Sequence, residues 1–127
     1  MDQLIAVSDF KDLKVWQKAH ALALAVDRVT NSARSPAYSS LRSQTIPAAM
    51  SIDANIAEGR GRRSDRDLIR FLRIAIGSCY ELEAHLIMGR DLRFVKGPDF
   101  ETLHEQLVEV RRMLFGLIKY LSTATRA

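Results

Sequence analysis

The segment LHEQLVEVRRMLFGLIKYL, residues 103–121, decides the fold class, because its apolar side chains repeat with the spacing of a packed helix. Leucine or valine recurs at steps of four and three residues, at Leu103, Leu107, Val110, Leu114, Leu117 and Leu121. This spacing places the six side chains along one stripe of an α-helix, and such stripes pack against antiparallel neighbours in helical bundles. The segment therefore predicts a buried helix over about residues 99–122.

Three more segments show apolar side chains at helical spacing, and Gly or Pro residues separate them from one another. They predict helices over about residues 11–33, 38–58 and 65–89. Gly59 and Gly61 are expected to form a flexible stop between the second and third helices. Four amphipathic helices joined by short connections predict one all-α domain, an up-down-up-down four-helix bundle.

Two local signals bear on the ends of these helices. Pro47 lies inside the second predicted helix, and because proline lacks an N–H donor we expect either a kink or a helix that begins later. Ser64 precedes Asp67 by three residues, a spacing typical of an N-terminal cap in which the serine oxygen accepts a backbone N–H. The third helix is therefore expected to begin at about Asp65.

Composition limits the class of protein. The chain has 127 residues, of which 47% are hydrophobic and 27% charged, which is typical of one folded globular domain. Because it shows neither a secretory leader nor about 18 consecutive uncharged residues, we expect a cytoplasmic protein with no membrane partner. The single cysteine, Cys79, lies among apolar helix positions and is expected to be a buried, reduced side chain.

The third and fourth predicted helices carry more apolar side chains than one bundle core needs. A second row on the third helix and one residue on the fourth are rotated away from the main stripes, and these are the candidate contacts between subunits: Ile69, Ile76, Tyr80, Ile87 and Phe115. A helix that is apolar over most of its circumference is buried on more than one side. Self-association into a homo-oligomer is therefore expected, although these residues would alternatively widen a single core.

A basic cluster follows the second predicted helix. Six arginines occur within fourteen residues beside only two aspartates, and they are Arg60, Arg62, Arg63, Arg66, Arg70 and Arg73. Their local excess accounts for the net charge of +4, and the last three follow one side of a helix. Two interpretations stay open: weak, sequence-independent contact with the phosphates of RNA or DNA, or a solvated helix face with local Asp–Arg pairs. No aromatic residue is expected to interleave this cluster, so it should lack a platform for base stacking.

A polar stripe on the second helix also has two interpretations. Gln44, Ser51, Asn55 and Glu58 are spaced so that they share one side of the helix. In the structural interpretation, Asn55 and Glu58 form hydrogen bonds across the bundle, to helix ends or to an arginine such as Arg62. In the functional interpretation, the stripe lines a groove or the centre of a ring and contacts a ligand.

The sequence resembles the 23S rRNA intervening-sequence proteins over most of its length. The resemblance rests on the segments DFKDLKVWQKA (residues 9–19), LRSQ with SIDANIAEG and GR (41–44, 51–59 and 61–62), FLRIAIGS (71–78) and YELE (80–83). It implies a four-helix bundle that assembles into a ring, commonly a pentamer. It also implies a relationship to the accessory protein of diversity-generating retroelements, which binds nucleic acid and a reverse transcriptase. The family name records a position within ribosomal RNA genes and implies no activity.

Three features depart from the family pattern. Ile46-Pro47 replaces a pair of basic residues, Asp53 replaces proline or another small residue, and Ile76 replaces an arginine. Three cationic positions are lost and one acidic residue is gained. These departures lower the affinity for nucleic acid that the resemblance implies.

No arrangement of residues predicts an enzyme, so catalytic, cofactor-binding and metal-binding residues are all expected to be absent. Glu101 and His104 form one Glu-x-x-His step, whereas a di-iron bundle needs two such steps and further glutamates. We therefore expect a non-enzymatic homo-oligomeric scaffold or interaction protein, with weak nucleic-acid contact as an added role. The alternative is an assembly factor that binds only proteins.

Overall fold

The computed structural model describes residues 9–31 and 36–126, and all regular structure in these ranges is helical. Two short 3₁₀ helices, η1 and η2, precede the first two of four long α-helices, α2 to α5. Their bounds are η1 Phe10–Asp12, α2 Lys14–Asn31, η2 Pro36–Tyr38, α3 Ser39–Arg60, α4 Asp65–Asp91 and α5 Gly97–Arg126. The predicted all-α class is confirmed.

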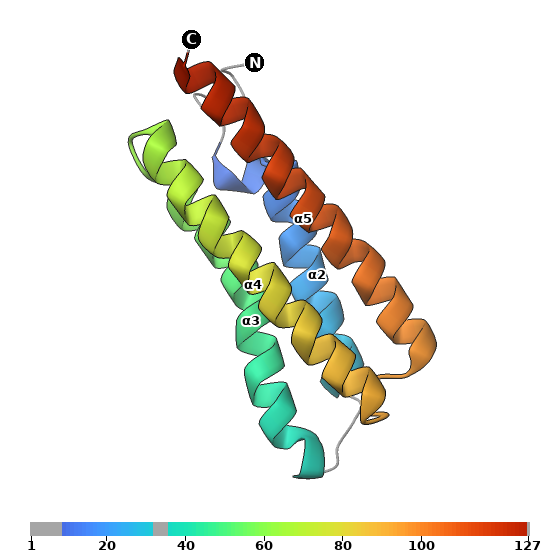
Figure 1. Ribbon diagram of the computed structural model, residues 1–127. Coiled ribbons are helices and arrows are strands. Elements are labelled where there is room, and N and C mark those ends of the chain that lie inside the picture. Colours follow the sequence, from blue (N-terminus) through green and yellow to red (C-terminus); the bar gives the residue numbers. More distant parts are fainter. Residues whose placement is uncertain (1–8, 32–35, 127) are drawn as a thin grey trace.

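The four α-helices run antiparallel to their neighbours in chain order (Figure 1). Helix α3 packs between α2 and α4, and α5 closes the bundle by packing against both α4 and α2. The pair α2–α3 and the pair α4–α5 therefore form opposite sides of the bundle. This arrangement leaves each helix pair with one outward surface.

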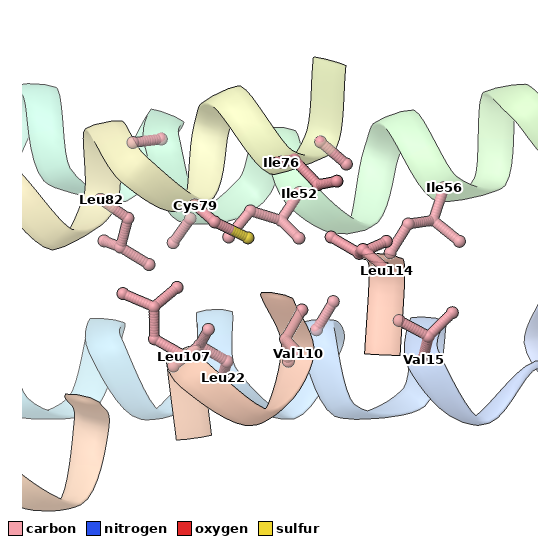
Figure 2. Packing of buried hydrophobic residues seen from close by; sticks show 14 of the residues in the cluster. Val15, Leu22, Ile52, Ile56, Ile76, Cys79, Leu82, Leu107, Val110 and Leu114 are labelled. Atoms are coloured by element: carbon pink, nitrogen blue, oxygen red, sulfur yellow. The ribbon is translucent and has the colours of Figure 1, made fainter. Parts of the chain in front are cut away.

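The predicted leucine seam of α5 is buried along its whole length, with Leu107 and Leu114 fully inaccessible to solvent. The main stripe of α4 is buried too, including Leu72, Cys79 and Leu82. Figure 2 shows apolar side chains of α3 and α4 meeting those of α2 and α5, with the sulfur of Cys79 inside this core. Burial of these side chains is the main force that stabilises the bundle.

One predicted helix start differs from the structure, and the structure excludes the later start that was left open for a second helix. The first helix is divided, because η1 ends at Asp12 and the extended backbone of Leu13 separates it from α2, which begins at Lys14. Its predicted end at residues 32–33 lies outside the described residues. Helix α3 begins at Ser39 and passes through Pro47, so a later start is wrong. Because proline has no N–H, the Ser43 carbonyl lacks its usual helical hydrogen bond from residue 47. Ser43 and Pro47 are both exposed, so this carbonyl lies at the surface and not in the core.

The turn between α3 and α4 is tighter than the sequence predicted. Gly59 is not part of a flexible stop but a buried residue in the last turn of α3, and a Cβ atom there would lie 2.7 Å from the Cβ of Phe71. Gly61 ends the helix by donating its N–H to the carbonyls of Ala57 and Glu58. The predicted cap is confirmed, because the Ser64 hydroxyl accepts the Asp67 N–H at 3.1 Å.

The connection from α4 to α5 covers one end of the bundle. Phe94 and Val95 are buried there, and Val95 packs so closely on Gly89 that a Cβ atom at this glycine would lie 3.0 Å from it. The ring of Phe94 stacks on Tyr38 with 4.9 Å between centroids. In the part of the chain that the structure describes, no helix is long and apolar enough to span a membrane.

Candidate functional site

The outward surface of α4 and α5 carries exposed apolar side chains, and we refer to Tyr80, Ile87 and Phe115 as the α4–α5 face. Tyr80 is 51% exposed and Phe115 is 48% exposed, although both are large side chains that are normally at least partly covered. These three predicted interface candidates therefore lie on the surface of the single chain. Their exposure leaves apolar area available for contact with another molecule.

The other two interface candidates do not belong to this face. Ile76 is only 8% exposed and is part of the chain's own core, so its assignment to an interface is wrong. Ile69 is half-buried against the same core. Both residues are close enough to the main stripe of α4 to turn inward, which the helical spacing alone did not distinguish.

A network of charged side chains borders the α4–α5 face. The Glu83 carboxylate on α4 bridges two groups on α5: one oxygen lies 2.7 Å from His104 Nε2, and the other accepts a hydrogen bond from Arg111 at 2.9 Å. The Arg111 guanidinium also lies 4.6 Å from the centroid of the Tyr80 ring. The network therefore joins α4 to α5 and fixes the position of the exposed tyrosine.

This network makes stability depend on pH. Hydrogen bonds from Arg111, and next from His104, hold the pKa of Glu83 below its usual range. Because the pKa of Glu83 is lower in the folded chain than in the unfolded chain, the ionised carboxylate stabilises the fold at pH values above the unfolded pKa of about 4.3. This stabilisation is lost as the pH falls through the pKa of the folded state.

Replacing Glu83 with glutamine is expected to flatten the acid side of the stability profile, because the ionised carboxylate is no longer available. The free energy of unfolding, measured by urea denaturation between pH 2.5 and pH 7, should then change less with pH than in the wild type. Glu81 is an exposed neighbour, so Glu81→Gln is the matched control. An acid limb as steep in Glu83→Gln as in the wild type would contradict this account.

The basic cluster lies around the turn between α3 and α4. Arg62 forms an ion pair with Glu58 at 2.8 Å, and Arg70 approaches Asp67 at 3.9 Å. The other members differ, because Arg63, Arg66 and Arg73 are exposed and form no ion pair with any described residue. Arg60 is half-buried in the last turn of α3. Three of the six arginines therefore remain free to meet an external anion.

The expectation that no aromatic residue interleaves this cluster is wrong. Phe71 packs beneath it, with the Arg62 and Arg70 guanidinium groups 4.8 and 4.6 Å from its ring centroid. Because Phe71 is itself buried, its ring positions the two arginines and does not offer a face for stacking a base. The cluster is suited to contacts with phosphates and lacks a means to recognise bases.

The polar stripe of α3 is divided between internal and exposed roles. Ser51 reaches across to α4, where its hydroxyl lies 2.8 Å from that of Ser78. Asn55 was expected to bond across the bundle, but its amide donates back to the Ser51 carbonyl at 2.8 Å within the same helix. Gln44 and Glu58 are exposed. Glu58 pairs with Arg62 four residues later, as the structural interpretation allowed, but this contact is local and exposed, and Asn55 reaches α4 only through Ser51.

The described residues contain no group of three or more His, Cys, Asp or Glu side chains placed to hold a metal ion. His104 of the Glu-x-x-His step is bound to Glu83, and burial raises the pKa of the Cys79 thiol to about 12. This thiol is therefore protonated at neutral pH and a poor nucleophile.

An open apolar groove of about 430 Å³ lies between the start of α2 and the second half of α5, where sequence analysis predicted no site. Its walls include Leu13, Val15, Met113 and Tyr120. Gly116 forms part of the wall, and a Cβ atom there would meet nothing within 4 Å. Sequence spacing does not reveal such a groove, because the groove depends on how α2 and α5 pack against each other.

These features define an all-α protein of four long helices that carries exposed apolar and basic side chains on its surface. The chain belongs to the 23S rRNA-intervening sequence protein family, whose model matches residues 11–116. A solved structure with the same fold is a protein of unknown function from the S23 ribosomal protein family of Bacteroides thetaiotaomicron. The two chains share 23% identity with a TM-score of 0.77, over 83% of this chain and 98% of that one. None of the curated proteins compared with the chain matches it.

Proposed function

We propose that this protein is a non-enzymatic, homo-oligomeric scaffold whose subunits meet through the α4–α5 face. The observation that carries the proposal is the exposure of Tyr80 and Phe115 on the same side of a bundle whose core is otherwise closed. Aromatic side chains are enriched at the centres of protein interfaces, because they bury much apolar area with few rotatable bonds. A second copy of the chain supplies the cover that the single bundle lacks.

The charges beside this face favour a protein partner. Arg111 is largely buried against Glu83 and Tyr80, so its charge is already balanced within the chain. Burying an unpaired charge in an interface costs several kcal/mol. Because Arg111 is already paired, an interface that covers the α4–α5 face avoids this cost. The assembly that we propose is a closed ring, with five subunits as the family resemblance implies.

Gel filtration with light scattering tests the assembly. A ring is expected to give one mass that is an integer multiple of the 14.3 kDa chain and is constant over a tenfold dilution. A species of 14.3 kDa at every concentration would remove the proposal. Metal analysis and an activity screen of the same fractions would overturn the non-enzymatic part if either revealed a stoichiometric metal or turnover.

A second role, weak and sequence-independent contact with RNA or DNA, is supported by Arg63, Arg66 and Arg73. These side chains are exposed and lack internal partners among the described residues, so binding a phosphate would break no existing ion pair. Repetition of the cluster around a ring would multiply a weak contact into a stronger one. An assembly factor that binds only proteins is the alternative, in which the same arginines serve solubility.

Substituting these three arginines with alanine is expected to weaken binding to a duplex oligonucleotide of any sequence. The slope of log affinity against log salt should fall by about one for each phosphate that an arginine no longer neutralises. Fluorescence anisotropy over a salt series measures both quantities. The matched control removes three other exposed charges by changing Arg28, Lys96 and Lys119 to alanine. Equal losses in the two variants would mean that only net charge matters, and no loss in either would favour the protein-binding alternative.

A further inference from the structure

The apolar groove between the start of α2 and the second half of α5 has room for an occupant. Its volume of about 430 Å³ lies within the range of about 300–1,000 Å³ that is typical of ligand pockets. On the α5 side its wall extends from Met113 to Tyr120, seven residue steps or about 10 Å of helix. Apart from Asp12 and Lys14, its lining residues are uncharged. The groove is therefore suited to an uncharged apolar group about 10 Å long.

The chain itself contains a segment with these properties directly before the groove. Leu4-Ile5-Ala6-Val7 is an uncharged apolar run, and it ends two residues before Asp9, where the described part of the chain begins. In extended form, four residues span three steps of about 3.3 Å, or about 10 Å in all. Transfer of such side chains from water to an apolar site is favourable. The run therefore matches the groove in both length and chemistry.

The point at which this segment joins the fold is fixed beside the groove. The Asp9 carbonyl accepts the Asp12 N–H at 2.9 Å, and Asp12 belongs to the groove wall. The 3₁₀ helix η1 is held against α2, because the Gln17 amide donates to the Lys11 carbonyl at 2.8 Å. From Asp9 back to Leu4 the chain can reach about 17 Å, which exceeds the length of the groove.

The covalent connection favours this segment over a separate molecule. A segment joined to its site by a short linker acts as if it were present at a millimolar concentration. A contact too weak to hold a free peptide is then still formed in most molecules. Because residues 4–7 carry no charge, their entry into the apolar groove requires no ion to lose its water.

We infer that Leu4-Ile5-Ala6-Val7 docks in the groove of its own chain and joins the start of α2 to the second half of α5. We refer to these four residues as the N-terminal strap. The strap covers apolar side chains of the groove wall, Met113 among them, and it connects the first and last long helices of the bundle. The groove lies within one chain, so this inference does not depend on the self-association proposed above.

Cysteine cross-linking tests the position of the strap. Gly116→Cys places a thiol in the groove wall without a clash, because an added Cβ would meet nothing within 4 Å. Successive side chains of an extended segment point to opposite sides, so this change is combined with either Ile5→Cys or Ala6→Cys. At least one of the two pairs is expected to link within one chain when treated with a short bismaleimide. Native Cys79 gives little background, since its side chain is fully buried. Gly77→Cys on α4, also with open space around an added Cβ, replaces Gly116→Cys in the matched control and should give no link.

The mass of the linked product decides the outcome. A linked species with the mass of one chain, found with Gly116→Cys and not with Gly77→Cys, is the expected result. A product with the mass of two chains would mean that the strap fills the groove of another copy, and the same-chain inference would be wrong. No link with Gly116→Cys in either pair, or an equal yield in the control, would also overturn it.

Oxidation of Met113 gives an independent measurement that needs no cross-linker. Ile5→Asp would bring an unpaired charge into the groove, so it is expected to release the strap. The rate at which hydrogen peroxide oxidises Met113, divided by the rate for the exposed Met50 on α3, should then rise at least threefold. Gln3→Asp, which adds the same charge at a polar position beside the strap, is the matched control and should leave this ratio unchanged. An unchanged ratio in Ile5→Asp, or an equal rise in Gln3→Asp, would overturn the inference.

Discussion

Replacing both Tyr80 and Phe115 with lysine is expected to convert the assembly into monomers of 14.3 kDa. Each substitution would place an unpaired ammonium group in the contact, and burying such a charge without a partner costs several kcal/mol. Sedimentation velocity of the double variant should show a single slow species at concentrations where the wild type remains assembled.

The folded bundle itself should tolerate this change. Both side chains are about half exposed in the single chain, and substitutions at such positions usually alter stability little. Met88→Lys is the matched control, because Met88 is an exposed apolar residue on α4 that is not one of the three residues defining the α4–α5 face. Dissociation of the control to the same extent, or persistence of the oligomer in the double variant, would contradict the role given to the α4–α5 face.

Changing Gly59 to alanine is expected to destabilise the fold by about 1–3 kcal/mol, the usual range for overpacking a closed core. The added methyl group would lie 2.7 Å from the Phe71 Cβ and 3.0 Å from a Leu68 methyl carbon. Neither neighbour is the far end of a flexible side chain with free space around it, so α3 and α4 must separate. Urea denaturation followed by circular dichroism measures the change in unfolding free energy.

Gly77→Ala is the matched control for the change at Gly59. Gly77 also lies inside a helix, but an added Cβ would meet nothing within 4 Å. Alanine is favoured over glycine in a helix by about 0.8–1.0 kcal/mol, so this variant should be more stable than the wild type. Opposite signs at the two glycines are the expected result. A gain in stability at Gly59 would show that α3 and α4 are less closely packed than the structure indicates.

The sequence predicted the helices well where the apolar spacing was regular. The heptad stripe from Leu103 to Leu121 specified α5, and the cap formed by Ser64 specified the start of α4. A local signal that competes with packing left two alternatives open. Pro47 allowed either a kink or a later start in the helix predicted over residues 38–58; α3 begins at Ser39 and continues through the proline, with Thr45 and Ala48 on either side of it buried.

The candidate surfaces were only partly predictable. Spacing identified Tyr80, Ile87 and Phe115, but it could not tell that Ile76 turns into the core, because the two rows on α4 are close together in angle. The exposed Leu24 of α2 and Met50 of α3 were not identified, since an isolated apolar residue on a polar helix face gives no periodic signal.

The polar networks could not be predicted from spacing at all. His104 and Arg111 lie 21 and 28 residues after Glu83 in the chain, and they reach it only when α5 packs against α4. The same holds for Ser51 and Ser78, which lie 27 residues apart. The apolar stripe of each helix can be found in a single sequence. The offset between two neighbouring helices along their axes cannot, and these contacts depend on that offset.

Oxidative footprinting of the wild-type protein tests most directly whether another copy covers the α4–α5 face. Hydroxyl radicals modify exposed aromatic and sulfur-containing side chains, so the single chain by itself would be modified at Tyr80, Phe115 and Met88 alike. We predict that Tyr80 and Phe115 are protected at concentrations where the protein is assembled, and that Met88 is oxidised rapidly. Modification of Tyr80 and Phe115 at the rates of half-exposed side chains would contradict the assembly.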